Sequence, residues 1–278
     1  MISVVICSID EPKFTAALNM YARLLDGYPF EIIHIPDAKG ICEGYNRAVS
    51  LSRGQLILFS HDDITIHCQD FRSRLLGHME HCDVLGIAGT NRLCNGNWVT
   101  AGMPHIFGQV VHDRTDTDKF RVVMYGVPKR RIDSIQALDG ALMCCRREVA
   151  QRILFDPTGF PGYHLYDLDF SFRAYLAGYR LSVACDFDVV HSSYWRYDEA
   201  WQTDSATFDR KHAANLAPAP RQFCQLSFII TLTLQEALAL LHPPFWEDPQ
   251  AQKTCKPRRH ERNDEIPMTN DESNPKYK

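Results

Sequence analysis

The sequence predicts an α/β domain built around a mostly parallel β-sheet. Two observations predict this class. Short apolar segments rich in β-branched residues alternate with segments of helical spacing in the N-terminal part of the chain. This strand–helix–strand order is typical of parallel sheets, whose strands need crossover connections. The chain has 278 residues, of which 45% are hydrophobic and 23% charged, so it can bury a sizeable core.

The first elements follow from the apolar pattern. Strands are predicted where apolar residues run together between turn residues, at Ile2–Cys7, Phe30–Ile35 and Gln55–Ser60. Helices are predicted between these strands, at Phe14–Leu25 and Gly44–Leu51. The order of these elements gives two consecutive strand–helix–strand units.

The second half of the chain is less regular. Glycine, asparagine and proline crowd the region Asn91–Arg131, which predicts short strands and loops, with Arg121–Arg131 irregular. The later strands are predicted at Ile135–Cys145 and Leu181–Val190. Between them we expect helices at Val149–Leu154 and Asp167–Gly178, the second stopped by its glycine.

Composition excludes some classes of function and favours others. The net charge is -4, from 30 basic and 34 acidic residues, so no electrostatic footprint for DNA or RNA is present. The ten cysteines are scattered without a CxxC spacing, which favours a reduced, cytoplasmic protein that uses cysteine as a small apolar residue. The opening MISVVICSID lacks a basic segment and is predicted to be a strand, not a signal peptide.

Three parts are expected along the chain: a folded domain over residues 1–215, an amphipathic helical extension over 216–245, and a polar, disordered tail over 246–278. The apolar stretch 226–241 is too short and too polar to predict a membrane span. We expect it to form a helix that packs on the domain, on a membrane surface or on a second copy of the chain.

Acidic residues follow a buried strand at His61-Asp62-Asp63. Ligands of open α/β sheets bind at the carboxyl ends of the strands. Two adjacent carboxylates there are compensated well by a hard divalent cation that also contacts a diphosphate. The alternative is a solvated turn or a helix cap, because aspartate caps helices readily.

A second acidic pair, Asp167 and Asp169, opens a predicted helix within the segment GYHLYDLDF at residues 162–170. Either residue alone would be explained as a helix cap. The surrounding aromatic residues suit a sugar site, where a carboxylate can accept a proton from a hydroxyl. Residues two positions apart on a helix point about 200° apart, so only one of the two can face the site.

His191 follows the last predicted strand, where an imidazole could bind a metal such as Mn²⁺. A structural role is the alternative for a lone histidine.

These segments together resemble the family-2 glycosyltransferases of GT-A fold, from Ile2 to about His212. The segments that carry the resemblance are SVVICS, EGYNRA at residues 43–48, LILFSHDDI, LDGA at residues 138–141, GYHLYDLDFSFRAYLAGYRL, Val190-His191, Trp98 and FDRK at residues 208–211. Trp98 and the segment at residues 208–211 also resemble a poorly characterised bacterial subgroup of this family.

The resemblance implies an inverting transfer of a sugar from a nucleotide-diphosphate sugar to a glycan, lipid or protein acceptor. It implies that Asp63 and His191 bind Mn²⁺ or Mg²⁺, and that Asp167 is the catalytic base, with Asp169 as the second candidate. The implied nucleotide-sugar-binding residues are Ser8, Asp10, Asp37, Asn46, Arg47, His61 and Asp62. The implied acceptor-side residues are Trp98, Asp139, Gly140 and Tyr166.

Two positions depart from the family pattern. His61 stands where the family's Asp-x-Asp motif has its first acid, which puts a contact to the ribose in doubt. Tyr166 stands where the family often has glutamate. Two other functions therefore stay open: a catalytically inactive sugar-nucleotide-binding protein, or a nucleotidyltransferase. The second would normally have a glycine-rich basic loop after the first strand, and SIDEPKF has none.

The composition of the tail generates a prediction about stability. Residues 246–278 contain few apolar side chains, so they cannot bury enough surface to fold. Truncation before Pro249 should leave the melting temperature nearly unchanged in thermal denaturation. A fall of many degrees would show that the tail docks.

Overall fold

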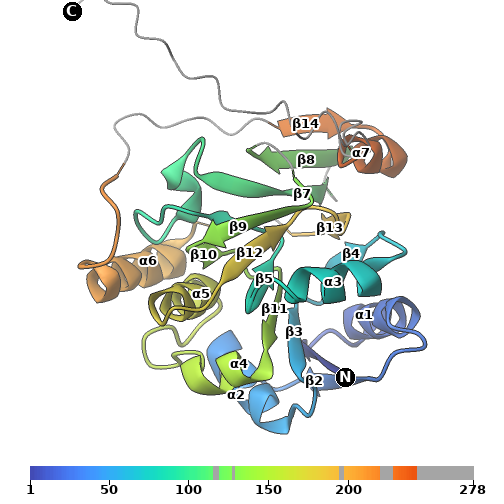
Figure 1. Ribbon diagram of the computed structural model, residues 1–278, viewed down its shortest axis with the longest axis horizontal. Coiled ribbons are helices and arrows are strands. Elements are labelled where there is room, and N and C mark those ends of the chain that lie inside the picture. The colour runs from blue at the N-terminus through green and yellow to red at the C-terminus, as the bar shows by residue number, and fades with distance from the viewer. Residues whose placement is uncertain (115–118, 127–128, 194–196, 220–227, 243–278) are drawn as a thin grey trace, which may run out of the picture. The chain divides into compact units, whose positions relative to one another are not determined.

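The structure, a computed structural model, describes residues 1–114, 119–126, 129–193, 197–219 and 228–242 (Figure 1). Residues 1–243 form one compact unit. A second unit, residues 244–278, lies outside the described residues, and so does the tail expected over 246–278.

The helices are α1 (Glu11–Leu24), α2 (Ile41–Leu51), α3 (Phe71–Met79), the short 3-10 helix η1 (Trp98–Ala101), α4 (Arg147–Ile153), α5 (Tyr166–Leu176), α6 (Glu199–His212) and α7 (Leu234–Leu240). The strands are β1 (Ile2–Cys7), β2 (Phe30–Ile35), β3 (Leu56–Ser60), β4 (Ile64–Ile66), β5 (Val84–Gly86), β6 (Ala88–Thr90), β7 (Ile106–Arg114), β8 (Lys119–Tyr125), β9 (Arg131–Ile135), β10 (Ala137–Leu138), β11 (Leu142–Arg146), β12 (Leu181–Ala184), β13 (Val189–His191) and β14 (Phe228–Thr231).

The central sheet has the strand order β2-β1-β3-β11-β5-β12-β9. Strands β2, β1 and β3 pair in parallel, as the alternation of strands and helices predicts, and β12 is parallel to β5. Strand β11 is antiparallel to both of its neighbours, and β9 is antiparallel to β12. The predicted α/β class, with a central sheet flanked by helices, is confirmed, but the pairing in the sheet is mixed.

Alternation along the central strands fills both faces of this sheet. Ile2, Val4 and Ile6 of β1 point to one face, where they pack with apolar residues of α1 and α3. Phe59 of β3 points to the other face and contacts Tyr45 of α2, with ring centroids 4.7 Å apart. Helices therefore cover both faces of the central sheet (Figure 1).

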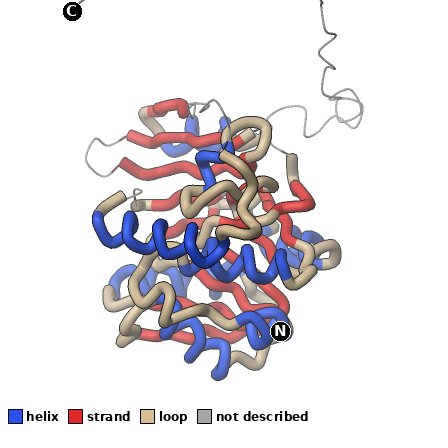
Figure 2. Tube along the Cα trace, turned by 90° about the vertical axis from the view of Figure 1, so that its left-hand side faces the viewer, coloured by secondary structure: helices blue, strands red, loops and turns tan. Residues whose placement is uncertain are grey.

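A second sheet has the order β10-β6-β7-β13-β4, and β8 and β14 extend it from β7. Figure 2 shows the strands one above another, with helices beside them. Strand β13 pairs with both β4 and β7, which places His191 opposite Ile64 and His112. The end of the last predicted strand thus lies beside the turn that follows β3.

The predicted strands Ile135–Cys145 and Leu181–Val190 are each divided between the two sheets. Strand β10 belongs to the second sheet and β11 to the central one, and the turn at residues 139–141 between them is closed by a bond from the Ala141 amide to Asp139. Strands β12 and β13 are separated in the same way by residues 185–188, where Asp188 has a positive φ of 53°. Apolar runs predicted these strands but not the change of sheet.

Two further predictions of local structure are wrong. The segment Arg121–Arg131 was expected to be irregular, but its first residues belong to β8, which pairs along its whole length with β7 and buries Val122, Val123 and Tyr125. Residues 228–240 form a strand and a short helix, not one helix, because β14 pairs with β8 before a capping box at Thr233 starts α7. Within the described residues, no helix is long and apolar enough to cross a membrane.

The eight cysteines in the described ranges are all free, and seven of them are buried. Burial raises the pKa of Cys145 to about 12, so this thiol stays protonated. These residues pack as small apolar side chains, as their scattered spacing predicts.

Candidate active site

Two adjoining cavities lie at the carboxyl ends of β1 and β3. The smaller, of about 330 Å³, is lined by the ends of β1 and β2 and by the first turns of α2. The larger, of about 640 Å³, extends toward α5, α6 and η1. Both are lined by His61, Asp63, Tyr163 and Tyr166, which therefore form the junction of the two cavities.

Three side chains converge at this junction with atoms that can bind a metal. His61 and Asp63 lie in the turn between β3 and β4, and His191 ends β13. Oδ1 of Asp63 lies 3.2 Å from Nε2 of His191 and 3.8 Å from Nδ1 of His61, and the two imidazole nitrogens are 3.4 Å apart. The predicted pair Asp63 and His191 is thus brought together, with His61 as a third member.

The carboxylate of Asp63 is held in place without being fully bonded. Its Oδ1 atom is buried and lies 3.2 Å from Nε2 of His191. Burial raises the pKa of Asp63, but the neighbouring His191 and His61 lower it by more, so the pKa falls below its ordinary value. A buried carboxylate oxygen with a spare lone pair beside two imidazoles fits the donor set of a divalent cation.

His112 and Ser193 support the triad and were not predicted from the sequence. Ser193 Oγ lies 2.8 Å from Nε2 of His191, and His112 Nδ1 lies 3.1 Å from the Ser193 carbonyl oxygen. Burial and the nearby His191 lower the pKa of His112 to about 4, so this ring is neutral at physiological pH. His112 lies on β7, within the region that the sequence pattern did not resolve, so no local signal marked it.

Asp167 lies in the first turn of α5 and lines the larger cavity. Leu165, the residue before the helix, has a left-handed φ of 57°, which turns the chain sharply into Tyr166. A Cβ atom on Gly140 would lie 2.5 Å from the Tyr166 hydroxyl oxygen and 2.7 Å from the Asp167 Cβ. Glycine at this position therefore lets the β10–β11 turn approach the start of α5 and places Asp139 beside Asp167.

The environment of Asp167 suits a group that exchanges protons near neutral pH. Burial raises its pKa to about 7, and the negative charge of Asp139 contributes in the same direction. Hydrogen bonds from backbone amides act against this shift. A general base is most effective when its pKa lies near the working pH.

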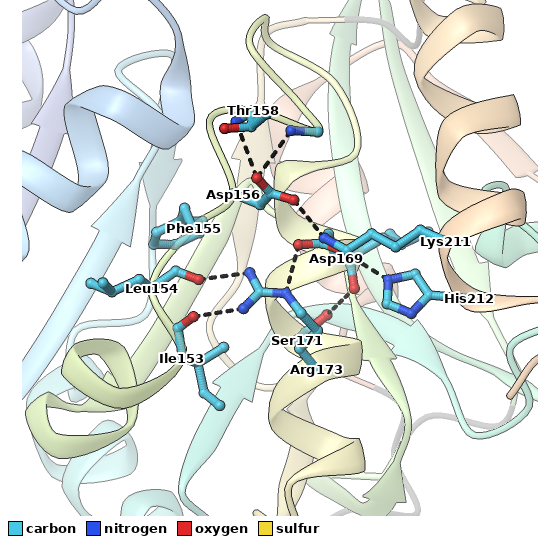
Figure 3. A network of polar contacts seen from close by, with 12 residues as sticks. Ile153, Leu154, Phe155, Asp156, Thr158, Asp169, Ser171, Arg173, Lys211 and His212 are labelled. Atoms are coloured by element: carbon cyan, nitrogen blue, oxygen red, sulfur yellow. Dashed lines mark hydrogen bonds and ion pairs between the residues drawn. The ribbon is translucent and has the colours of Figure 1, made fainter.

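Asp169 lines neither cavity. The structure therefore corrects the prediction that Asp169 is a second candidate for the catalytic base. Its buried carboxylate lies 2.7 Å from Arg173, 2.6 Å from Lys211 and 2.9 Å from His212 (Figure 3). Burial raises the pKa of Asp169, but these three partners outweigh it and lower the pKa. The helical period explains the division, because Asp167 and Asp169 lie on different faces of α5.

Only some of the predicted nucleotide-sugar-binding residues reach the smaller cavity. Ser8, His61 and Asp62 line it, and the Ser8 hydroxyl donates a 2.5 Å hydrogen bond to Asp62. Asp10 instead caps α1 by accepting a bond from the Lys13 amide.

The remaining three are engaged elsewhere. Asn46 bonds both the amide and the carbonyl of Phe155, at 2.8 Å each, and thereby joins α2 to the end of α4. Asp37 and Arg47 pair with each other at 2.7 Å on the surface. The local pattern could not show these partners, which are distant in sequence or on another element.

All four predicted acceptor-side residues, Trp98, Asp139, Gly140 and Tyr166, line the larger cavity. Tyr166 does more than line it, because its hydroxyl lies 2.7 Å from Nε2 of His61. Tyr197, which precedes α6, and Trp201 of α6 also line this cavity and were not predicted; their rings meet edge-on with centroids 4.6 Å apart.

The sequence matches the family described as "Glycosyltransferase like family" over residues 3–215. The chain therefore belongs to this glycosyltransferase family, as the resemblance implied, and is a transferase. Comparison with curated proteins gives no match.

Solved structures with a similar chain path include three glycosyltransferases. The mannosyltransferase PcManGT from Pyrobaculum calidifontis, solved with GDP-Man and Mn²⁺, has a TM-score of 0.49 and 13% identity over 91% of this chain and 73% of its own. TarS from S. aureus, solved with UDP-GlcNAc, has a TM-score of 0.45 and 16% identity over 72% and 60%. GalNAc-T7, solved with UDP, GalNAc and Mn²⁺, has a TM-score of 0.47 and 14% identity over 76% and 47%.

The network around Asp169 generates a stability prediction. Replacing Asp169 by alanine leaves Arg173, Lys211 and His212 without their shared anion, so the free energy of unfolding should fall by about 3–5 kcal/mol. Urea denaturation of both variants measures this effect against Asp37→Ala, which removes one partner of an exposed ion pair and should leave stability nearly unchanged. Equal small losses in the two variants would contradict a structural role for Asp169.

Proposed function

We propose that the protein is an inverting, metal-dependent glycosyltransferase that moves a sugar from a nucleotide-diphosphate sugar to an acceptor hydroxyl in glycan or polysaccharide biosynthesis. The observation that carries this proposal is the position of Asp167. This carboxyl group, whose pKa is about 7, lines the same cavity as the triad His61, Asp63 and His191. A proton acceptor and a set of metal-binding atoms thus share one space of about 640 Å³.

The two cavities suit the two parts of a donor. The smaller cavity, between β1, β2 and α2, has the size and position for the nucleoside, where Ser8 and Asp62 offer polar contacts. The diphosphate would then lie at the junction beside Asp63, and the sugar in the larger cavity. A divalent cation held by Asp63 and His191 would supply charge neutralisation to the departing diphosphate.

In this arrangement Asp167 acts on the acceptor. Its deprotonated carboxylate removes a proton from the attacking hydroxyl, whose oxygen attacks the anomeric carbon opposite the diphosphate, so the configuration is inverted. Asp139 keeps the pKa of Asp167 high by its negative charge and so makes Asp167 a stronger base. Gly140 permits the close approach that puts the two residues side by side.

The lining of the larger cavity favours a carbohydrate acceptor. Aromatic side chains from η1, β8, α6 and two loops line this space, among them Trp98, Tyr125, Tyr163, Tyr197 and Trp201. Aromatic faces pack against the C–H faces of a sugar ring, and polar groups at their edges bond its hydroxyls. Lys13, His164 and Asp139 supply such polar groups on the same cavity wall.

Replacing the base should separate binding from turnover. Asp167→Asn keeps the shape of the side chain but removes its proton-accepting carboxylate, so turnover should fall by roughly 10²–10⁴-fold while donor affinity survives. The measurement is sugar transfer or slow donor hydrolysis, with Asp169→Asn as the comparison. Asp169→Asn should act through stability, and an inactive Asp169→Asn beside a fully active Asp167→Asn would reverse the two roles.

The same residue fixes the expected pH dependence. A base must be deprotonated to act, and burial raises the pKa of Asp167 to about 7. The rate should therefore rise with pH up to about 7, and it should fall about tenfold per unit of pH below that value. A rate independent of pH between 5 and 8 would show that Asp167 is not the base.

Metal dependence is tested by nucleotide binding. UDP, TDP or GDP should bind much more tightly with Mn²⁺ or Mg²⁺ than with EDTA, because the diphosphate otherwise meets Asp62 and Asp63 without compensation. Calorimetry on wild type and Asp63→Ala measures this, and the substitution should abolish the metal effect. Equal affinity with and without metal would refute the proposal, and binding without turnover would indicate an inactive sugar-nucleotide-binding protein.

A further inference from the structure

The triad at the junction of the two cavities has the dimensions of a metal site that uses both imidazoles. The three facing atoms, Nδ1 of His61, Oδ1 of Asp63 and Nε2 of His191, are separated by 3.4, 3.8 and 3.2 Å. A circle through them has a radius of about 2.0 Å, close to the ~2.0–2.2 Å bonds that such atoms make to Zn²⁺ and similar ions. One cation can therefore contact all three atoms at once, in place of the hydrogen bond between Ser193 Oγ and Nε2 of His191.

We propose that His61 is a third protein ligand of the cation, through Nδ1, and that Tyr166 is a positioning residue that holds His61 in the required tautomer. The resulting set of two nitrogens and one oxygen makes the site selective for Mn²⁺ and later transition metals over Mg²⁺. This inference rests on the metal dependence proposed above.

Tyr166 contacts Nε2 of His61, whereas Nδ1 of His61 faces Asp63 and His191. Its hydroxyl oxygen lies 2.7 Å from Nε2 of His61 and 3.4 Å from the Gly140 carbonyl oxygen. The 2.7 Å contact is the strong one, since 3.4 Å is longer than an ordinary O–H···O hydrogen bond. In the tautomer that our proposal requires, Nε2–H donates to the phenol oxygen, and the hydroxyl proton is directed to the carbonyl. Nδ1 then keeps its lone pair, and this is the atom that faces Asp63 and His191.

The phenol is itself held firmly. Tyr166 is only 4% exposed, and its ring packs edge-on against Tyr45 with centroids 5.7 Å apart. Both His61 and Tyr166 depart from the family pattern, and the structure shows the two departures in direct contact. They therefore act as one unit, in which an imidazole supplies the ligand atom and a phenol orients it.

The donor set decides the preferred ion. Mg²⁺ prefers oxygen ligands and is reluctant to exchange water for nitrogen, whereas imidazole suits the transition metals. Affinity for nitrogen-containing sites rises from Mn²⁺ toward the later divalent metals. Asp63 supplies the only oxygen among the three proposed protein ligands. The site should therefore bind Mg²⁺ much more weakly than Mn²⁺.

The test uses the full chain and metal ions alone, without a sugar donor. Pulsed electron paramagnetic resonance of bound Mn²⁺ detects the ¹⁴N nuclei of coordinated imidazole, and calorimetry gives the affinities for Mn²⁺ and Mg²⁺. Wild type should show two coupled nitrogens and a clear preference for Mn²⁺. His61→Asp should show one nitrogen and reduce the Mn²⁺/Mg²⁺ affinity ratio at least tenfold.

Two further variants separate ligation from general effects. Tyr166→Phe keeps the ring but removes the oxygen, so it should lower Mn²⁺ affinity about tenfold and weaken the coupling assigned to His61. His105→Asp removes an imidazole that bonds Asn91 and lines neither cavity, so it should change neither the couplings nor the affinity ratio.

Three results would overturn the inference: no Mn²⁺ bound to wild type, two nitrogens retained in His61→Asp, or unchanged metal selectivity in that variant. Unchanged Mn²⁺ affinity and couplings in Tyr166→Phe would overturn its positioning role. Because none of these measurements involves transfer, two nitrogens in a protein that transfers no sugar would refute the proposed function and leave the ligand assignment standing.

Discussion

The buried carboxylate of Asp169 is the contact on which the arrangement of the site depends. One anion without access to solvent holds Arg173 of its own helix and Lys211 and His212 of α6 (Figure 3). Arg173 continues to the carbonyls of Ile153 and Leu154 at the end of α4. A buried charge is tolerated only when it is compensated in this way, so α4, α5 and α6 are fixed relative to one another.

The fixed helices in turn hold the reactive groups. Lys211 also bonds Asp156, which closes the turn at residues 156–159 before the chain reaches α5. Phe155 stacks on Phe170 of α5, with ring centroids 4.3 Å apart. Asp167 therefore lies in the first turn of a helix that is held by ion pairs and by aromatic packing. This support keeps α5 rigid, as a positioned base requires.

Whether a feature of the fold or the site could be predicted depends on how far apart in the sequence its interacting residues lie. The strands β1, β2 and β3 follow from local β-branched runs. The pairing of Asp63 with His191 was expected only through the resemblance to the glycosyltransferase family. The contact of His61 with Tyr166 joins positions 105 residues apart, and no local pattern encodes it. The bond of Asn46 to Phe155 was not predictable for the same reason, since the two residues are 109 positions apart.

The raised pKa of Asp167 also ties the protein's stability to pH. In the unfolded chain an aspartate loses its proton near pH 4, whereas in the folded protein Asp167 keeps it up to about pH 7. The folded state therefore binds more protons across this interval, and its stability declines as pH rises through it. The deprotonated carboxylate that acts as the base is thus also the form that lowers the free energy of unfolding. At the pH values where Asp167 can remove a proton, the protein is less stable than it is at lower pH.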